Sequence, residues 1–239
     1  VRDISFDLRH GEILGVAGVD GNGQSELVEA IAGLRPVTSG QISISGRTLA
    51  AFQPSDLLDL NVAHIPQDRQ KVGLVMDFSV SENLVARLFS LLPFARSGFL
   101  QWKAIRENAE GRIKEFDIRV PNSEVKARAL SGGNQQKVIL ARELSRAPDL
   151  ILASQPTRGL DVGATEFVVG RLLEQRVRGA AIIYVSTELE EILSLSDRIM
   201  VLHRGEIMGM VRPGEATEEE MGLMMAGEKR MAPQEMEAR

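Results

Sequence analysis

The sequence predicts an α/β fold, with a mixed, largely parallel sheet, an antiparallel β edge and an inserted block of helices. Three observations support this prediction. Short apolar runs that are typical of buried strands alternate with helical patterns, as in parallel sheets covered by helices. A strand, a glycine-rich loop and a helix follow one another near the start of the chain. Two alternating runs on either side of Arg204-Gly205 predict a hairpin near its end.

The first part of the chain reads as strands around one helix. Residues 4–8 alternate apolar and polar side chains and predict an edge strand, and residues 13–17 predict a buried strand. An amphipathic helix is expected from Glu26 to Ala32, ended by Gly33. Two further short strands are expected within 39–46 and 61–66.

The middle of the chain, from about residue 79 to 147, reads as a helical subdomain inserted into the α/β domain. Ser79 and Glu82 offer a helix start, and leucines at helical spacing continue the pattern over 83–92. After a break at 93–98, a second helix is expected over 102–118 and a third from Ser131 to about Ser145. Four aromatic residues could form a partner surface or plain core, and we expect core for most of them: Phe89, Phe94, Phe99 and Trp102.

The last part returns to alternating strands and helices. Strands are expected at 150–153 and 180–186, and helices at 164–178 and 189–195. The hairpin, with strands 197–202 and 206–211, is followed by a helix that ends at Ala226, and residues 228–239 are expected to fray. We therefore expect a single domain over 1–239, with its α/β core at 1–78 and 148–227.

The composition excludes several classes of protein. The apolar share is 44% and the charged share 26%, as in a soluble globular domain. There is no cysteine, so disulfides and thiolate metal sites are excluded. A net charge of −5 without a basic run argues against a dedicated nucleic-acid binder.

The apolar stretch at 180–185 is far shorter than the roughly 20 residues of a membrane helix, so we expect a membrane role only through a partner. No signal peptide is visible, and the strand-like start at Val1 predicts a domain cut from a longer chain.

The glycine-rich loop predicts a phosphate site. The pattern Gly-x4-Gly-Lys-Ser/Thr is matched at Gly18, Gly23 and Ser25, but Gln24 replaces the lysine. Backbone donors and the helix N-terminus can still hold a phosphate. A charge-assisted hydrogen bond is worth about 1.5–3 kcal/mol against about 0.5–1.5 kcal/mol for a neutral one. We therefore expect weakened phosphate binding.

Two later motifs carry chemistry only in combination with this loop. The Ser131-Gly132-Gly133 turn opens a helix and suits either an anion or a simple helix cap. The strand at 150–153 ends at Ser154 and Gln155, where nucleotide-hydrolysing folds carry carboxylates. Gln67 follows a strand and could reach a metal-bound water or cap the loop, and capping is favoured. The segment 156–161 could be an ordinary loop, and the three histidines, His10, His64 and His203, read as structural.

Together these motifs resemble the nucleotide-binding domain of ABC transporters over nearly the whole chain. Residues 18–25 resemble the Walker A loop, Gln67 the glutamine loop, and 130–134 the signature motif. Residues 150–155 resemble Walker B with the catalytic position, 158–161 the D-loop, and Thr187 falls at the switch position. The combination is similar to the second, C-terminal ATPase domain of monosaccharide and nucleoside importers, and more so to the nucleoside type.

The resemblance implies an ABC-type P-loop NTPase fold that uses ATP and Mg²⁺. It also implies head-to-tail pairing with an N-terminal nucleotide-binding domain of the same polypeptide, transmembrane permease partners and no nucleic acid. The chain would then act at the cytoplasmic face of the membrane. The residues expected to bind nucleotide, with Ser25 and Gln67 also weak metal ligands, are Gly18, Asp20, Gly21, Asn22, Gly23, Gln24, Ser25, Glu26, Gln67, Ser131, Gly132, Gly133 and Asn134.

The departures from the family pattern predict a degenerate half-site. The family would have lysine, aspartate, glutamate and histidine at positions 24, 154, 155 and 187, where this chain has Gln24, Ser154, Gln155 and Thr187. Loss of a general base alone removes about 10²–10⁴ in rate. The signature motif, by contrast, is intact and would serve the partner's ATP site. Two alternatives stay open, a regulatory nucleotide sensor without a transport role and a non-transport relative acting on nucleic acid or ribosomes.

Overall fold

The computed structural model describes residues 1–49 and 53–232. The chain divides into two compact units. The first unit consists of Val1–His64, Asp149–Gln155 and Arg176–Arg239, and the second of Ile65–Pro148 and Pro156–Gln175. The helical block expected at about 79–147 falls inside the second unit, which extends further on both sides of it. Residues 233–239 of the predicted frayed tail lie outside the described residues.

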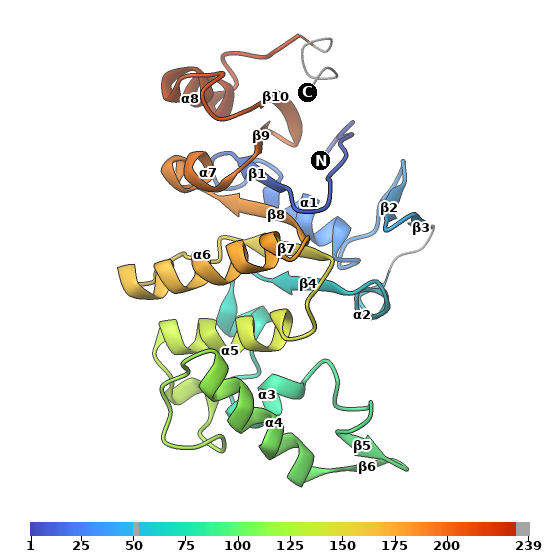
Figure 1. Ribbon diagram of the computed structural model, residues 1–239. Helices are drawn as coiled ribbons and strands as arrows, with labels where there is room; N and C mark the ends of the chain where they lie inside the picture. The colour runs from blue at the N-terminus through green and yellow to red at the C-terminus, as the bar shows by residue number, and fades with distance from the viewer. Residues whose placement is uncertain (50–52, 233–239) are drawn as a thin grey trace. The chain divides into compact units, whose positions relative to one another are not determined.

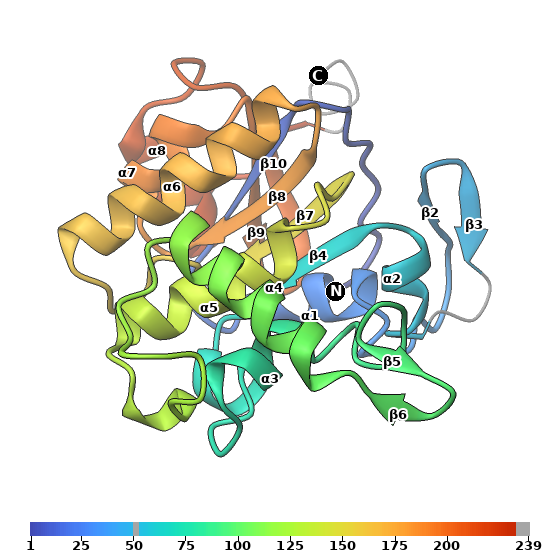
Figure 2. The ribbon, with the colours of Figure 1, turned by 60° about the horizontal axis from the view of Figure 1, so that its bottom comes forward.

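The first unit is built on a six-stranded sheet with the strand order β10-β9-β1-β8-β7-β4 (Figures 1 and 2). β1 is parallel to β8 and to β9, β7 is parallel to β8, and β10 is antiparallel to β9. The strands are β1 (Ile13–Ala17), β4 (Val62–Ile65), β7 (Leu150–Ser154), β8 (Ala181–Ser186), β9 (Arg198–His203) and β10 (Glu206–Val211). The mixed sheet with one antiparallel edge is the predicted architecture.

The core of the first unit packs around β1, every residue of which is buried. Leu14 and Val16 point into a cluster with α1 (Gln24–Ile31) and the neighbouring strands. Burying one such side chain stabilises the fold by roughly 1.5–3 kcal/mol. The remaining elements of this unit are α2 (Asp56–Asp59), α7 (Leu189–Leu195), α8 (Glu218–Ala226) and a separate hairpin of β2 (Ile42–Ile44) and β3 (Arg47–Leu49).

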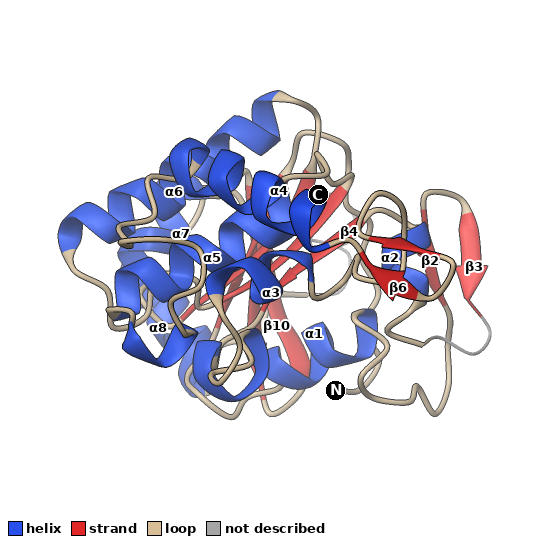
Figure 3. Cartoon of the chain, turned by 90° about the horizontal axis from the view of Figure 1, so that it is seen from below, coloured by secondary structure: helices blue, strands red, loops and turns tan. Residues whose placement is uncertain are grey.

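The second unit is mainly helical (Figure 3). α3 (Val80–Val85) contacts α4 (Trp102–Glu115) and α5 (Gly132–Leu144), and a hairpin of β5 (Ala95–Arg96) and β6 (Phe99–Leu100) connects α3 to α4. A π-helix at Arg69–Gly73 and a 3₁₀ turn at Ala127–Ala129 complete this unit, while α6 (Val162–Val177) runs from the second unit into the first.

The predicted capping box at the start of α3 is confirmed. The Ser79 hydroxyl accepts a hydrogen bond from the Glu82 N–H at 3.2 Å, and the Glu82 carboxylate accepts one from the Ser79 N–H at 2.7 Å. Such a cap satisfies two backbone donors that a helix leaves unpaired and is worth about 1 kcal/mol. The four residues from Ser79 to Glu82 therefore specify where this helix begins.

Two predicted elements were wrong in form. Residues 4–8 form no strand, because no neighbouring described strand pairs with their backbone, although Ile4, Phe6 and Leu8 do pack against the core. The helix expected over 83–92 ends at Val85, and turns follow it. Leucine spacing alone cannot separate a helix from a series of turns that also buries every third or fourth side chain.

The β5–β6 hairpin was missed, and the expectation for the aromatic residues was wrong for three of the four. Phe94 is buried, but Phe89, Phe99 and Trp102 are exposed. Ser97-Gly98 supplies the hairpin turn, with positive φ at both residues. A two-residue turn ending in glycine is a recognised hairpin signal, yet the flanking strands here are only two residues long.

Gly15 in β1 provides a test of how tightly this sheet is packed. A Cβ atom there would lie 2.2 Å from Ser196 Oγ and 3.0 Å from Ile192 Cγ2, and the Ser196 hydroxyl is itself buried without a hydrogen-bond partner in the described structure. We expect Gly15→Ala to lower the free energy of unfolding by about 1–3 kcal/mol. Adding Ser196→Gly should recover part of this loss, as measured by urea unfolding.

Gly170→Ala in α6 is the matched control, because a Cβ atom there meets nothing within 4 Å. This substitution should stabilise the helix by about 0.5–1 kcal/mol. A Gly15→Ala protein as stable as the wild type, or one that Ser196→Gly does not rescue, would contradict the steric explanation.

Candidate phosphate-binding site

Three of the predicted motifs meet at the carboxyl ends of neighbouring parallel strands. The glycine-rich loop follows β1, Ser154 and Gln155 lie at the end of β7, and Thr187 follows β8. Ala17 is level with Ser186, and Ser154 is level with Val185. Ligands of open α/β sheets bind at this edge. The sheet therefore brings these sequence-distant residues to one place.

The loop between β1 and α1 requires glycine at specific positions. A Cβ atom on Gly18 would lie 2.4 Å from Gln24 Nε2 and 2.8 Å from the Leu202 carbonyl oxygen. Gly23 caps α1 in the left-handed region, with φ 109°, and a Cβ atom there would lie 2.9 Å from Gly205 Cα. A side chain at either position would push the loop open. The glycines thus keep the backbone N–H groups and the N-terminus of α1 in the tight turn that can hold a phosphate.

Gln24 occupies the position of the missing lysine and is 5% exposed. Its Nε2 donates a hydrogen bond to the Val19 carbonyl oxygen at 3.1 Å. A lysine ammonium carries three donors and a charge, whereas this amide is neutral and uses a donor within the loop itself. Gln24 therefore supports the loop shape and adds no positive charge to it.

Asn22 ties the loop to the β9–β10 turn. Its side-chain oxygen accepts a hydrogen bond from the Arg204 N–H, and its carbonyl oxygen accepts one from the Gly205 N–H, both at 2.8 Å. Its Nδ2 donates to the Val19 carbonyl oxygen at 3.0 Å. These hydrogen bonds give Asn22 a structural role in holding the loop. The sequence pattern gave no signal for this anchor.

Gln155 reaches across to the same loop. Its Nε2 donates a hydrogen bond to Asp20 Oδ1 at 2.9 Å, and its backbone N–H donates to the Val185 carbonyl oxygen at 2.7 Å. Gln155 is 8% exposed and has φ 44°, a conformation that costs a residue other than glycine about 1–3 kcal/mol. The amide at the expected catalytic position thus joins the end of β7 to the phosphate loop. Sequence reasoning placed both residues in the site but missed this bond.

The metal-binding capacity of this site is small. Ser154 is buried and offers a hydroxyl where a carboxylate would hold a hydrated cation, and Ser25 is exposed in the first turn of α1. Among the described residues, no group of three or more His, Asp or Glu side chains could hold a metal ion. Mg²⁺ prefers carboxylate and phosphate oxygens. The side chains present do not form a site of that kind.

The signature residues lie in the second unit at the start of α5. Ser131 is the N-cap, and its hydroxyl accepts a hydrogen bond from Asn134 Nδ2 at 3.1 Å and a longer one from the Asn134 N–H. Asn134 Oδ1 in turn accepts a hydrogen bond from the Arg119 N–H at 2.8 Å. The helix-cap role is therefore present. The N-terminus of α5 carries no acidic residue in its first turn and can face an anion.

Arg69 links the π-helix to the loop before α6. Its guanidinium donates to the Arg158 carbonyl oxygen at 2.8 Å and lies beside Gly132 and Gly159. The adjacent Asp68 caps the π-helix, and the backbone N–H of Lys71 lowers the pKa of its carboxyl, followed by that of Gln70. Gln67 precedes this segment in the second unit, and both the capping role that its sequence position favours and the weak metal-ligand role that the resemblance implies stay predictions.

Lys137, the last residue of the extended signature, is engaged in an ion pair. Its Nζ lies 2.7 Å from Asp117 Oδ2 and 4.6 Å from the centre of the Phe167 ring. The hydrogen bond from Lys137 lowers the pKa of the exposed Asp117 carboxyl. This cation therefore stabilises the packing of α5 against its neighbours.

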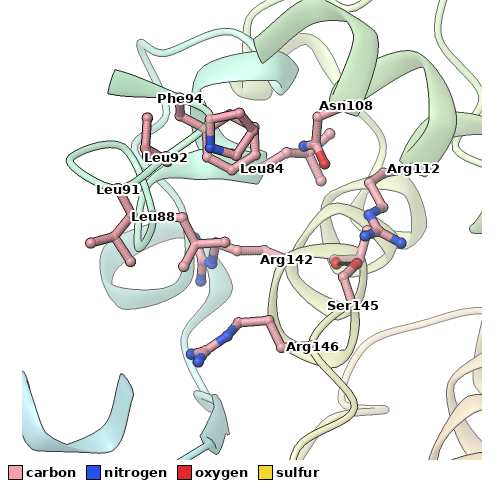
Figure 4. A pocket seen from close by; sticks show the side chains of 12 residues that line it. Leu84, Leu88, Leu91, Leu92, Phe94, Asn108, Arg112, Arg142, Ser145 and Arg146 are labelled. Atoms are coloured by element: carbon pink, nitrogen blue, oxygen red, sulfur yellow. Dashed lines mark hydrogen bonds between the residues drawn. The ribbon is translucent and has the colours of Figure 1, made fainter. Parts of the chain in front are cut away.

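The second unit also contains a cavity of ≈ 350 Å³ that no predicted site residue lines (Figure 4). One wall is apolar, formed by Leu84, Leu88, Leu91, Leu92, Pro93 and Phe94. The other wall is largely polar, formed by Asn108, Arg112, Ala141, Arg142, Ser145 and Arg146. Arg112 and Arg142 pair with Glu115 and Glu143 at 2.6 and 2.8 Å. The cavity is thus a half-apolar hollow.

Known proteins settle the family to which this arrangement belongs. The model of the ABC transporter family matches residues 1–158. The chain belongs to the ABC transporter family. A solved ATP-binding subunit of an ABC transporter superposes with a TM-score of 0.74 over 94% of this chain and 92% of that one, at 24% identity. The fold is therefore that of an ABC-type P-loop NTPase.

The curated relatives are ATP-binding proteins of importers. The chain is 51% identical to the guanosine import ATP-binding protein NupO of Bacillus subtilis and 47% identical to the nucleoside import ATP-binding protein NupA of Lactococcus lactis. These matches cover 95% of the chain but 44% and 45% of the relatives, so the chain spans less than half their length. Within the described residues, no helix combines the length and apolar character needed to cross a membrane.

The bond between Gln155 and Asp20 predicts that a return to the family residue destabilises this chain on its own. Gln155→Glu would replace a donor by a carboxylate facing Asp20 Oδ1. We expect the free energy of unfolding to fall by about 1 kcal/mol at neutral pH, because one hydrogen bond is lost and two like charges meet. Thermal or urea unfolding measures this change.

Asp20→Asn should rescue Gln155→Glu, because the asparagine amide can donate to the new carboxylate. The double variant should regain most of the lost stability, whereas Asp20→Asn alone should lose some. Additive effects in this double-mutant cycle would mean that the two side chains do not interact.

Proposed function

We propose that this chain is the ATP-binding domain of a nucleoside or sugar importer, and that its own half-site binds ATP without hydrolysing it. The observation that supports this most directly is the pair of amides, Gln24 and Gln155. They stand where the family resemblance expects a lysine and a glutamate, and both donate hydrogen bonds to the phosphate loop. Neither can act as a general base.

The chain offers more to the phosphates of ATP than to its metal. The glycine turn and the N-terminus of α1 supply backbone donors to a phosphate without needing a charged side chain. Gly18, Asp20, Gly21, Asn22, Gly23, Gln24, Ser25 and Glu26 would surround it. The ligands available to Mg²⁺ would be Ser25 and the nucleotide, because positions 154 and 155 carry Ser154 and Gln155 and no carboxylate. We therefore propose that ATP binding here depends little on Mg²⁺.

The intact signature motif supports a role in a partner's site. In this proposal the chain pairs head to tail with an N-terminal nucleotide-binding domain of the same polypeptide. Ser131, Gly132, Gly133 and Asn134 at the start of α5 would then face the partner's ATP. The pair would hydrolyse ATP at one site and keep the other occupied, so that the ATPase activity belongs to the subunit and the isolated domain is weak or inactive.

Transport requires transmembrane permease subunits, and the half-apolar cavity of the second unit supports such a partner. Its leucine wall can bury side chains of a short permease segment, which would hold the chain at the cytoplasmic face of the membrane. A nucleoside cargo is favoured over a sugar, because the two nucleoside-type relatives are 51% and 47% identical and the glucose-import relative is 43% identical.

ATP binding and turnover test this proposal. Binding of a fluorescent ATP analogue and phosphate release would be measured with Mg²⁺ and with EDTA. The wild-type chain should bind in both conditions and release no phosphate above the blank. The comparison variant is Asp20→Asn/Gln24→Lys/Ser154→Asp/Gln155→Glu, in which the first substitution gives the new carboxylate at position 155 a donor. Its binding should become Mg²⁺-dependent.

The signature motif is tested with a hydrolysis-competent partner domain. Adding the wild-type chain should raise the partner's phosphate release, and a Ser131→Arg chain should not, because the bulky cation blocks the start of α5. Mg²⁺-dependent turnover by the wild-type chain alone, lost in a Ser25→Ala variant, would overturn the degenerate half-site.

A further inference from the structure

Six exposed large apolar side chains of the second unit lie in one segment, whereas Val72, Val75, Phe78 and Val162 are exposed outside it. Between Asn83 and Arg106, six large apolar residues are at least two-fifths exposed: Phe89, Leu91, Leu92, Phe99, Leu100 and Trp102. Leu92 and Phe99 are 76% and 75% exposed. Contiguous exposed apolar groups mark interaction sites more often than chance exposure. The cavity accounts for Leu91 and Leu92 but not for the hairpin or for Trp102.

The geometry of the β5–β6 hairpin keeps the side chain of Phe99 exposed. Ser97 and Gly98 have φ 51° and 82°, a turn with two left-handed residues, and Arg96 pairs across the strands with Phe99. Cross-strand partners lie on the same face of a hairpin. Phe94, directly before β5, is buried with Val85 and Ile105 and anchors the base. The hairpin thus places a cation and an aromatic residue on the same face. Figure 1 shows the β5–β6 hairpin next to α4.

The charge of the same segment is of one sign. Residues 83–106 contain four basic residues, Arg87, Arg96, Lys103 and Arg106, and no acidic residue, in a chain whose net charge is −5. Arg96, Lys103 and Arg106 are exposed. Lys103 lies 3.8 Å from Glu107, an exposed pair that screens it only weakly. Arg87 is paired with Glu143 and the exposed Glu107 and Glu110 follow directly, so the basic character of the segment comes from Arg96, Lys103 and Arg106.

We propose that this region contacts an anionic phospholipid surface directly. We define the basic-aromatic surface as Arg96, Phe99, Leu100, Trp102, Lys103 and Arg106. Tryptophan beside basic residues is the composition found where proteins meet the membrane interface, and each cation near an anionic leaflet strengthens binding about fivefold. This contact is separate from any permease contact and from ATP binding.

The shape of the region favours lipid over a protein segment or a nucleic acid. A protein helix needs a groove, and none of the six residues of the basic-aromatic surface lines the cavity described above. The hairpin is a projecting element, which can enter a fluid headgroup layer. Strong nucleic-acid binding would require more phosphate contacts than three or four cations provide.

Trp102 is the only tryptophan of the chain, so its fluorescence reports on this surface alone. The chain would be titrated, without nucleotide or permease, with phosphatidylcholine vesicles and with vesicles that also contain phosphatidylglycerol. We expect a blue shift with the anionic vesicles only, which weakens as salt rises. Lipids brominated near the headgroup should quench the wild-type signal, a measurement that needs no variant and so no refolding control.

Two pairs of variants separate this surface from general charge and hydrophobicity. Arg96→Glu should weaken vesicle binding more than about tenfold, because it reverses a charge, and Phe99→Ser should weaken it about tenfold. The matched controls are Arg47→Glu on β3 and Val177→Ser on α6, both exposed residues outside the surface, which should bind as the wild type does.

Three results would overturn the proposal. These are no shift or quenching with anionic vesicles, equal loss in the control variants, or vesicle binding that Arg96→Glu and Phe99→Ser leave unchanged. If those two variants instead lose co-purification with a permease while vesicles remain unbound, the surface belongs to a protein partner. Because no nucleotide is present, failure here leaves the ATP-binding proposal untouched.

Discussion

The candidate site depends on the burial of β1 between two parallel strands. Every residue of β1 is buried, β8 and β9 hold it on both edges, and Gly15 lets α7 approach closely. This fixes where the strand ends, and so where the loop from Gly18 begins. The loop is then closed by its own side chains and by Asn22, which bonds to the β9–β10 turn. The phosphate loop is therefore preorganised by the sheet, and a ligand need not order it.

The replaced residues make sense as a set. A lysine, an aspartate and a glutamate would together add one positive and two negative charges to the site, and a carboxylate returned alone at position 155 would face Asp20. Gln24 and Gln155 keep hydrogen bonds without charges, and Gln155 accepts a strained backbone while doing so. The three replaced positions thus carry no charge, and the carboxyl of Asp20 remains beside Gln155. The hydrogen bonds of Gln24 and Gln155 preserve the shape that pairing with a second domain would require.

The sequence predicted what depends on periodicity and on motifs with a steric requirement. The buried strands, the cap at Ser79 and the glycines of the loop follow from burial, unpaired N–H groups and close approach. The bond from Gln155 to Asp20 joins residues 135 positions apart, and no local pattern encodes it. The exposed Phe99 was missed for a different reason. Hydrophobic residues are usually buried, so only the structure can show one that a two-residue turn holds outward.

The basic-aromatic surface and the cavity would act together because each is weak alone. A surface with one phenylalanine, one tryptophan and a few cations resembles a single lipid anchor, which gives only reversible binding, and stable attachment needs a second signal. A permease segment in the cavity would supply that signal and raise the effective concentration of the hairpin at the membrane. Once the permease segment is bound, the hairpin binds lipid as if the chain and the membrane were already linked. The lipid contact would favour those orientations of the second unit in which the hairpin faces the bilayer, and so bias how a permease meets it.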